Sequence, residues 1–438
     1  MKFNKLTTWV LIALAAGIVV GYICHTAFPA ETAKEIASYF TALTEIFLHL
    51  VKMIIAPLVF ATLVVGIASM GDAKSVGRVG AKALGWFVTA SLISLLLGLL
   101  WANVFRPGDG MHLALPDAGA STHLKTGSLD FKHFIVGIFP KSIFEALANN
   151  SVLQIVVFSL FFGFALCTVA AKTGAVIKSF FEELVHVMIR VTDYVMLFAP
   201  IGVFAAVAAA ITVQGLGVLT TYASFIVSFY FALATLWLVL IAAGFFFLRK
   251  RVFKLLKMVK EPTLIAFSTA SSEAAYPKTM EQLEKFGVKS EVTGFVLPMG
   301  YAFNLDGSMI YQAFALLFIA QVYGIEMSFA TQLSMLLVLM VSSKGMAGVS
   351  RASLVVVAAT LPLFGLPEAA LLLIMGIDVF LDMGRTATNV IGNSIATAVV
   401  AKWEGKLGET AADDAALPAT TATPVHAPEL AAPRGHAV

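Results

Sequence analysis

Long apolar runs, separated by short polar segments, form the main pattern of this chain. Eight runs approach or exceed the roughly 20 residues that an α-helix needs to cross a lipid bilayer. They occupy residues 9–24, 46–70, 84–105, 152–171, 195–213, 223–248, 295–322 and 369–401. No β-type alternation of apolar and polar residues competes with them. The pattern therefore predicts an all-α integral membrane protein, a helical bundle and not a β-barrel.

After about residue 260 the apolar runs are broken by small and polar residues. The breaks read FSTASSEAAYP at 267–277, NLDGS at 304–308 and SSKGMAGVSRAS at 342–353. The arms of the first break are only about 12 residues long, too short to cross, and the third break has the same build. We expect two re-entrant helical hairpins around one broken helix, as in transporters with inverted repeats. Close helix contacts through small residues are the alternative.

The last apolar run carries a polar face. On a helical wheel its strongly polar residues, apart from Thr388, lie within about 100° of arc. They are Asp378, Asp382, Arg385, Thr386, Asn389 and Asn393. A charge that faces lipid costs several kcal/mol, so this face should point into the bundle.

Two interpretations of Asp382 and Arg385 remain open. At a spacing of three residues they can neutralise each other as a structural pair. Alternatively, the planar guanidinium of Arg385 binds a substrate carboxylate while Asp382 faces an ammonium group. Thr386 and Asn389 would then add neutral hydrogen bonds. The second interpretation predicts a small zwitterion that carries an additional carboxylate.

The NLDGS segment is a candidate cation site. Asn304 and Asp306 supply the oxygen ligands that hard cations prefer. Gly307 would permit a break in the helix and so free backbone carbonyls. In the alternative interpretation, Asp306 merely caps the broken helix.

Composition and charge agree with a membrane protein. The chain is 59% hydrophobic and 13% charged, which excludes an ordinary soluble domain. Lys and Arg gather at 72–82, at 248–260 and after the last run, so the positive-inside rule predicts that both termini are cytoplasmic and that the number of crossings is even. We expect the first segment to be a retained helix and not a signal peptide. Cys24 and Cys167 lie in apolar segments, which predicts buried thiols without a disulfide.

Four ordered motifs now carry a resemblance. SSEAAYP, NLDGS, SSKGMAGVS and DMGRTATNVIGN resemble the dicarboxylate/amino acid:cation symporter family, which includes glutamate transporters. The resemblance extends to about residue 405 and implies eight spanning helices, two re-entrant hairpins, a homotrimer and an elevator mechanism. It implies a scaffold at about 1–75 and 130–215 and a transport domain at about 80–106 and 218–407. The Ala/Pro/Thr-rich segment 408–438 is expected to be a disordered tail.

The same resemblance implies site residues. Arg385 corresponds to the arginine that binds the substrate side-chain carboxylate, and Asp382 to the aspartate that binds its amino group. The other implied substrate contacts are Ser271, Ser272, Ser308, Val349, Thr386 and Asn389, with Ser271, Ser272 and Val349 near the α-carboxylate. The implied cation contacts are Gly300, Asn304, Asp306, Ser343, Asn389 and Asn393, with sodium possible at Asn304, Asp306 and Asn389. The second hairpin would be the outer gate, made mobile by Gly345 and Gly348.

Departures from the family pattern concern the coupling ion. Asn393 replaces a family aspartate, Leu305 replaces a methionine, and Ala90 beside Ser91 replaces a threonine. These losses disfavour full sodium coupling, so the coupling cation is expected to be a proton or sodium, with the proton slightly favoured. Glu273 is a possible proton carrier, or else a cap at the hairpin tip. No other cofactor is expected.

The predicted function is cation-coupled uptake of glutamate or aspartate, with C4-dicarboxylate symport as the alternative. Family members that move C4-dicarboxylates tend to lack an aspartate where Asp382 stands, which favours amino acids. The sequence has no Walker motif for ATP, and no H-E-x-x-H or G-x-S-x-G motif of an enzyme. A channel would favour repeated charged rings, whereas this chain has a single asymmetric charged face, so a channel is disfavoured. We expect a protein of the bacterial inner membrane, with lipid and a small acidic substrate as partners and no nucleic acid.

Overall fold

The computed structural model describes residues 3–70, 73–109, 136–169, 171–217, 222–343 and 352–408. Within these ranges every regular element is a helix, and the sole β-type pairing is an isolated antiparallel bridge between Val288 and Leu407. The all-α prediction is therefore confirmed for the described part of the chain. The predicted disordered tail lies outside the described residues, except for Gly408.

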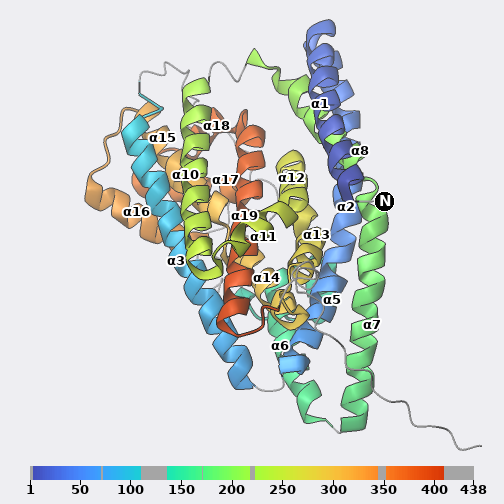
Figure 1. Cartoon of the computed structure of the whole chain (residues 1–438). Coiled ribbons are helices and arrows are strands. Elements are labelled where there is room, and N and C mark those ends of the chain that lie inside the picture. The colour runs from blue at the N-terminus through green and yellow to red at the C-terminus, as the bar shows by residue number, and fades with distance from the viewer. Residues whose placement is uncertain are drawn as a thin grey trace, which may run out of the picture.

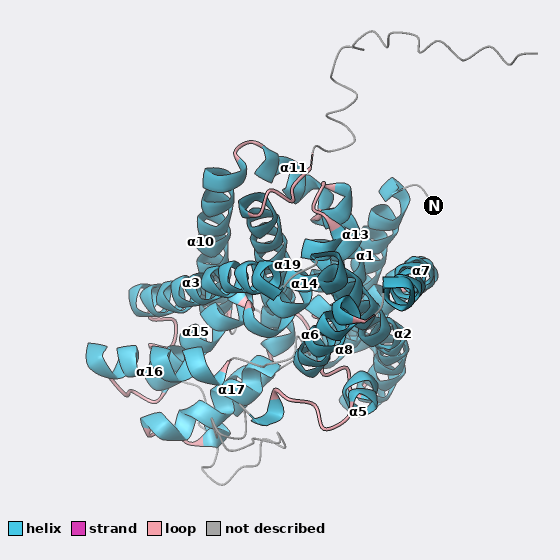
Figure 2. Cartoon of the chain, turned by 90° about the horizontal axis from the view of Figure 1, so that it is seen from below, coloured by secondary structure: helices cyan, strands magenta, loops and turns pink. Residues whose placement is uncertain are grey.

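One group of helices lies to the right in Figures 1 and 2. It consists of α1 (Phe3–Ala27), α2 (Ala30–Met70), α5 (Ile143–Ala148), α6 (Val152–Thr168), α7 (Ala171–Met196) and α8 (Ala199–Gln214). Helix α2 packs along α6, α7 and α8, and α1 packs along α8. A bend of 49° separates α7 from α8.

A second group surrounds the carboxyl-terminal helix. It consists of α3 (Ala73–Phe105), α10 (Ala223–Leu248), α11 (Arg251–Met258), α14 (Ser290–Phe303), α15 (Asp306–Val322), α16 (Phe329–Ser342), α17 (Ala352–Thr360) and α19 (Asp378–Trp403). Short helical turns precede α19: η1 (Leu361–Phe364), η2 (Glu368–Leu371) and α18 (Leu372–Met375). Helix α15 packs on α3, and α19 lies between α10, α12 (Lys260–Thr269), α14 and α15.

Helices α12 (Lys260–Thr269) and α13 (Ser272–Lys285) form a hairpin. Ala270 adopts a left-handed conformation with φ of 48° and ends α12, while the hydroxyl of Ser271 accepts a hydrogen bond from Ala274 N and caps α13. Glu261 at the start of α12 interacts electrostatically with Lys278 in the middle of α13 and with Lys285 at its end. The two helices therefore run back along each other. That this hairpin re-enters the membrane stays a prediction. The tip of the predicted second hairpin, 344–351, lies outside the described residues.

The described part contains five helical segments long and apolar enough to cross a membrane, or six if α7 and α8 form one bent span. Large apolar side chains on the outside, such as Leu238 at 69% and Phe246 at 68% exposure, suit contact with lipid. The chain is thus a multi-pass membrane protein. Cys24 is buried as expected, but Cys167 is exposed near the end of α6, so the prediction of two buried thiols was half wrong.

Helix α19 is buried on nearly every side from Asp378 to Ala401. Its polar face points into the bundle, as predicted, and meets α12 and α15 there. Its opposite face is covered by α10, where Trp237 Nε1 donates to Thr388 Oγ1 at 2.8 Å and Tyr230 donates to the Phe380 carbonyl at 2.6 Å. Polar side chains on α19 are therefore held in a protein interior and not at a lipid surface.

Candidate functional site

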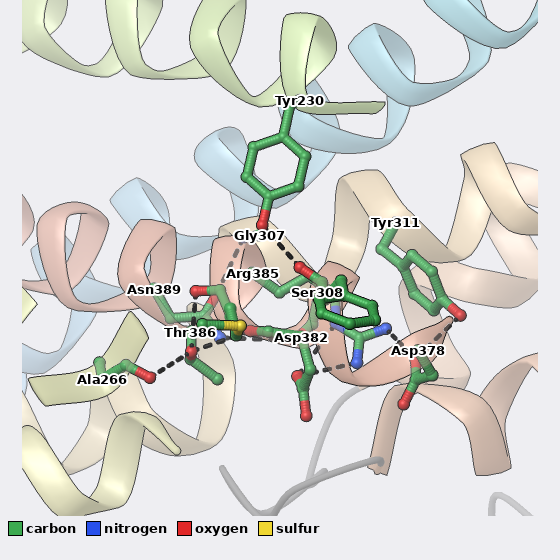
Figure 3. A network of polar contacts seen from close by, with 12 residues as sticks. Tyr230, Ala266, Gly307, Ser308, Tyr311, Asp378, Asp382, Arg385, Thr386 and Asn389 are labelled. Atoms are coloured by element: carbon green, nitrogen blue, oxygen red, sulfur yellow. Dashed lines mark hydrogen bonds and ion pairs between the residues drawn. The ribbon is translucent and has the colours of Figure 1, made fainter. Parts of the chain in front are cut away.

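Arg385 is completely buried and lies between two carboxylates of its own helix (Figure 3). Its Nη1 is 2.9 Å from Asp378 Oδ1, and its Nη2 is 2.8 Å from Asp382 Oδ1. Its Nε donates a further hydrogen bond to Asp382 Oδ1 at 3.1 Å. Spacings of seven and three residues place both carboxylates on the same helix face as the arginine. The structural pairing of Asp382 with Arg385, left open above, is thus present in this state.

Tyr311 on α15 completes the surroundings of the guanidinium. The Cζ atom of Arg385 lies 3.9 Å from the centre of the Tyr311 ring, a cation–π contact. The hydroxyl of Tyr311 donates to Asp378 Oδ1 at 3.2 Å. Asp378 was expected on the polar face as one of the intramembrane carboxylates, and no role was predicted for Tyr311. The seven-residue spacing between Asp378 and Arg385 could have indicated that they pair. No sequence feature near Tyr311 indicates its contact with Asp378, which is 67 positions away.

A cavity of about 570 Å³ lies beside this cluster. It is bordered by Asp382 on α19, by Thr269 and Ala270 at the hairpin tip, and by Thr41 and Thr44 on α2. This volume is within the range of small-molecule sites, and the wall combines apolar area with a few polar groups. Asp382 is 5% exposed and Arg385 is 0% exposed, so Asp382 is the member of the pair that borders open space.

The hairpin tip contacts α19 directly. Thr386 Oγ1 donates to the Ala266 carbonyl of α12 at 2.8 Å. Ser271 and Ser272 stand at the amino terminus of α13, and the buried Ser272 hydroxyl has no hydrogen-bond partner among the described residues. The amino end of a helix carries partial positive charge and free N–H groups, which favour a carboxylate. The predicted residues Ser271, Ser272 and Thr386 are therefore placed where an anionic group could be held near the cavity.

The predicted cation residues gather at the break between α14 and α15. Asn304 Nδ2 donates to Asp306 Oδ2 and to Asn393 Oδ1, both at 3.1 Å, and all three residues are buried. Gly300 lies against the same group, since a Cβ there would be 2.4 Å from Asn393 Oδ1. Three residues that are close in sequence, Gly300, Asn304 and Asp306, thus form one oxygen-rich cluster with the distant Asn393 of α19.

Asn389 connects this cluster region with the arginine. Its Oδ1 accepts from Gly307 N at 2.9 Å, and its Nδ2 lies 3.4 Å from the Ser308 hydroxyl (Figure 3). Gly307 itself lies inside the first turn of α15, because the break falls at Asn304 and Leu305. The prediction was that Gly307 permits the break, but the break lies before this residue. A Cβ at Gly307 would lie 2.3 Å from the Arg385 carbonyl, so the glycine allows α15 and α19 to approach closely.

The remaining predicted residues stand apart from these contacts. Ser343 is the carboxyl-terminal cap residue of α16, and its hydroxyl donates to the Met340 carbonyl of the same helix at 3.3 Å. Glu273 is buried in the first turn of α13, where Ser271 makes the cap, and it interacts electrostatically with Lys52 of α2. Val349, Gly345 and Gly348 lie outside the described residues.

The donor chemistry limits the kind of cation that this region can hold. Over the six described ranges, no group of three or more His, Cys, Asp or Glu side chains is arranged to hold a metal ion. The oxygens around Asn304 come from amides and one aspartate. Such a set matches a hard cation and not a transition metal.

Comparison with known proteins shows that the chain is similar to transport proteins for acidic solutes. The chain is 40% identical to the proton/sodium-glutamate symport protein of Geobacillus stearothermophilus over 93% of this chain and 97% of that protein. It is 38% identical to the proton/glutamate-aspartate symporter of Escherichia coli (strain K12) over 93% and 94%, and 40% identical to a C4-dicarboxylate transport protein of Brucella anthropi over 92% and 90%. Residues 6–403 match the family described as the sodium:dicarboxylate symporter family. The chain, a transporter and not an enzyme, therefore belongs to the sodium:dicarboxylate symporter family.

Proposed function

We propose that this protein is a secondary active symporter that takes up glutamate or aspartate together with protons or sodium. The observation that carries the proposal is the buried Arg385 paired with an aspartate, Asp382, that borders a cavity. The names of the two relatives that transport glutamate support it. Such a pair matches a ligand with an ammonium group and a carboxylate close together.

Binding would proceed by exchange of partners. The ammonium group of the substrate enters the cavity and pairs with the Asp382 carboxylate. This pairing frees Nε and Nη2 of Arg385 from Asp382. The side-chain carboxylate of the substrate then accepts from these two nitrogens, while Nη1 stays with Asp378. The α-carboxylate would lie at the amino end of α13, near Ser271 and Ser272, with Val349 of the second hairpin closing over it. Ser308, Thr386 and Asn389 would line the site with neutral groups.

Charge explains why cations must accompany the substrate. Asp378, Asp382 and Arg385 together carry a formal charge of −1, to which Asp306 and an acidic amino acid each add another. Unbalanced buried charge is costly, so binding requires cations nearby. Moving a net anion into an inside-negative cell is also opposed by about 2.3 kcal/mol per charge per 100 mV. At least two cations per substrate must enter before the membrane potential assists uptake.

The cluster at Asn304 is the proposed cation site, with Gly300, Asp306, Asn389 and Asn393 as further contacts. Ser343, which stands apart in this state, would join them only after a movement of α16. Its chemistry favours protons for part of the coupling. Asn393 is neutral, and its oxygen accepts from Asn304 in the place where a carboxylate would add a negative charge. The Asn304 amide N–H groups now lie between Asp306 Oδ2 and Asn393 Oδ1, and a sodium ion bound to these two oxygens would have to displace them. Glu273 is a candidate proton carrier because it is buried at the hairpin tip and faces Lys52 across the boundary with α2.

We further propose an elevator movement of one helix group against the other. The scaffold would comprise about 1–75 and 130–215, and the moving body about 80–106 and 218–407, including both hairpins. The packing of α1, α2 and α6–α8 as one group and the cavity along its boundary with α12 and α19 support this division. Eight spans with two re-entrant hairpins, a homotrimer, cytoplasmic termini and a bacterial inner membrane complete the proposal.

Proteoliposome uptake tests the function. Radiolabelled aspartate, glutamate and succinate are compared under separately imposed sodium and pH gradients. Concentrative uptake of aspartate or glutamate that requires one of these gradients is expected. Overall similarity does not separate amino acids from C4-dicarboxylates, because relatives of both kinds are about equally identical to the chain. Uptake of succinate alone would favour the alternative function and remove the amino-group role of Asp382.

A further inference from the structure

A groove of about 450 Å³ runs along the outside of the second helix group, away from the proposed substrate site. One face of α3 forms its floor, with Lys82, Trp86, Thr89 and Ile93 at helical spacing. The opposite wall is α10, and Phe247 and Trp403 line the end near Lys82 and Trp86. From residue 82 to residue 93 the groove follows α3 for about 16 Å. Its walls are apolar, and its polar groups gather at the end near Lys82.

The polar end holds two donors that the described residues leave partly unused. Trp86 packs edge-on to Phe247 and Trp403, with ring centres 6.0 and 5.9 Å away, and its buried Nε1 has no acceptor among the described residues. Lys82 Nζ uses two of its three N–H groups, one on Glu404 Oε1 at 2.6 Å and one on the Trp403 carbonyl at 3.1 Å. The two side chains are four residues apart on α3, so both donors lie at the same end of the groove.

Basic side chains are in excess around this end. Arg78 and Lys82 both bind Glu404, and Lys402 Nζ donates to the carbonyl of Phe247. These three cations and one carboxylate leave a formal excess of two positive charges at the mouth of an apolar groove. An anion attached to a long apolar chain complements both parts. Tryptophan and lysine are also the residues that place themselves where a bilayer changes from apolar to polar.

We propose that this groove binds an anionic phospholipid, with one acyl chain along α3 and the phosphate accepting hydrogen bonds from Lys82 and Trp86. The site does not involve the substrate residues, and the proposal does not depend on which solute is transported. Lipid bound here would hold α3, α10 and the end of α19 together.

The test measures binding of spin-labelled phosphatidylglycerol to the full-length protein in phosphatidylcholine vesicles. Trp86→Phe keeps an aromatic ring and removes the donor, so the apparent affinity should fall about fivefold, as for one lost hydrogen bond. Lys82→Gln should lower it by a similar factor. The matched control is Trp101→Phe at the other end of α3. Trp101 Nε1 is also buried without an acceptor among the described residues, but the nearby Arg106 pairs with two acids, Asp109 and Glu326.

Unchanged affinity in Trp86→Phe, or equal losses in Trp86→Phe and Trp101→Phe, would overturn the assignment. Lys82→Gln also disturbs the contact with Glu404 and could therefore fold poorly. In that case the Trp86→Phe result alone decides whether the groove binds the lipid phosphate. If glycerol 3-phosphate displaced the spin-labelled lipid as effectively as unlabelled phosphatidylglycerol does, the groove would be a site for a soluble phosphate and not for a lipid. Tighter lipid binding after removal of residues 409–438 would support the lipid site and show that this segment competes with lipid for the groove.

Discussion

Asp378 and Arg385 are seven residues apart on α19, and their side chains meet at 2.9 Å with neither exposed. Tyr311 donates to the same Asp378 oxygen and stacks under the guanidinium. Asp378 therefore holds one side of Arg385 independently of Asp382. In the proposed binding step, only the other side of the guanidinium exchanges its partner, from Asp382 to a substrate carboxylate.

Asp378→Asn should weaken apparent substrate affinity at least tenfold, because a hydrogen bond to a charged group contributes about 1.5–3 kcal/mol and the buried Arg385 loses its fixed counter-charge. Uptake kinetics in proteoliposomes measure the change. Tyr311→Phe serves as the comparison, since it keeps the ring contact and removes one hydrogen bond, and its effect should be smaller. Wild-type affinity in Asp378→Asn would contradict the holding role.

Arg385→Ala should abolish uptake of aspartate and glutamate, because two buried carboxylates lose their partner and the substrate loses its main anion-binding group. Arg385→Lys keeps a charge but lacks the planar fork, so some binding with strongly reduced affinity is expected. Size-exclusion chromatography must show that both variants are assembled. Unimpaired uptake in a folded Arg385→Ala protein would refute the site.

Asp382→Ser should impair amino-acid uptake by about tenfold or more relative to succinate, since only the amino acid presents an ammonium group. The ratio of kcat/KM for aspartate to that for succinate is the measurement. A change in this ratio separates recognition of the amino group from general damage to the site. Equal losses for both substrates would assign Asp382 to the structural pair with Arg385 alone.

Asn393→Asp should increase the dependence of uptake on sodium. The change adds a carboxylate beside Asp306 and Asn304, whose buried negative charge a cation must balance. Uptake at fixed pH, measured across a series of sodium concentrations, shows the effect, and Asn393→Ala is the neutral control. An identical sodium response in all three proteins would mean that this cluster does not determine the coupling ion.

Glu404 predicts a pH dependence of stability at the end of α19. Burial raises the pKa of its carboxyl, but hydrogen bonds from Arg78 and Lys82 more than compensate and hold the pKa below the ordinary value of 4.5. A lowered pKa in the folded state stabilises the protein above the ordinary value, and this contribution is lost as the pH falls through the lowered pKa. Glu404→Gln should therefore cost up to about 1 kcal/mol at pH 7, since both cations are partly exposed. Thermal unfolding should show the difference shrinking below about pH 4.5; a constant difference would contradict the prediction.

The sequence predicted the parts of the site that lie within one helix or one motif. The helical period aligned Asp382, Arg385 and Asn389 on one face, and the small residues of the 267–277 break indicated the turn between α12 and α13. Gly307 shows the limit of local reasoning. A glycine near a polar break suggested the break itself, whereas its function is to let the Arg385 carbonyl approach from another helix.

The sequence by itself determined a helical membrane protein with a buried polar face, because the length of an apolar run and its 3.6-residue period are local properties. Only the tertiary structure decided the partners of that face. Tyr311 reaches Asp378 across 67 positions, and Asn304 reaches Asn393 across 89. Such contacts depend on how α15 packs against α19, and many packings satisfy the same pattern of polar and apolar residues. The contacts of a buried charge are therefore decided by the whole bundle, although the presence of that charge can be read from a single helix.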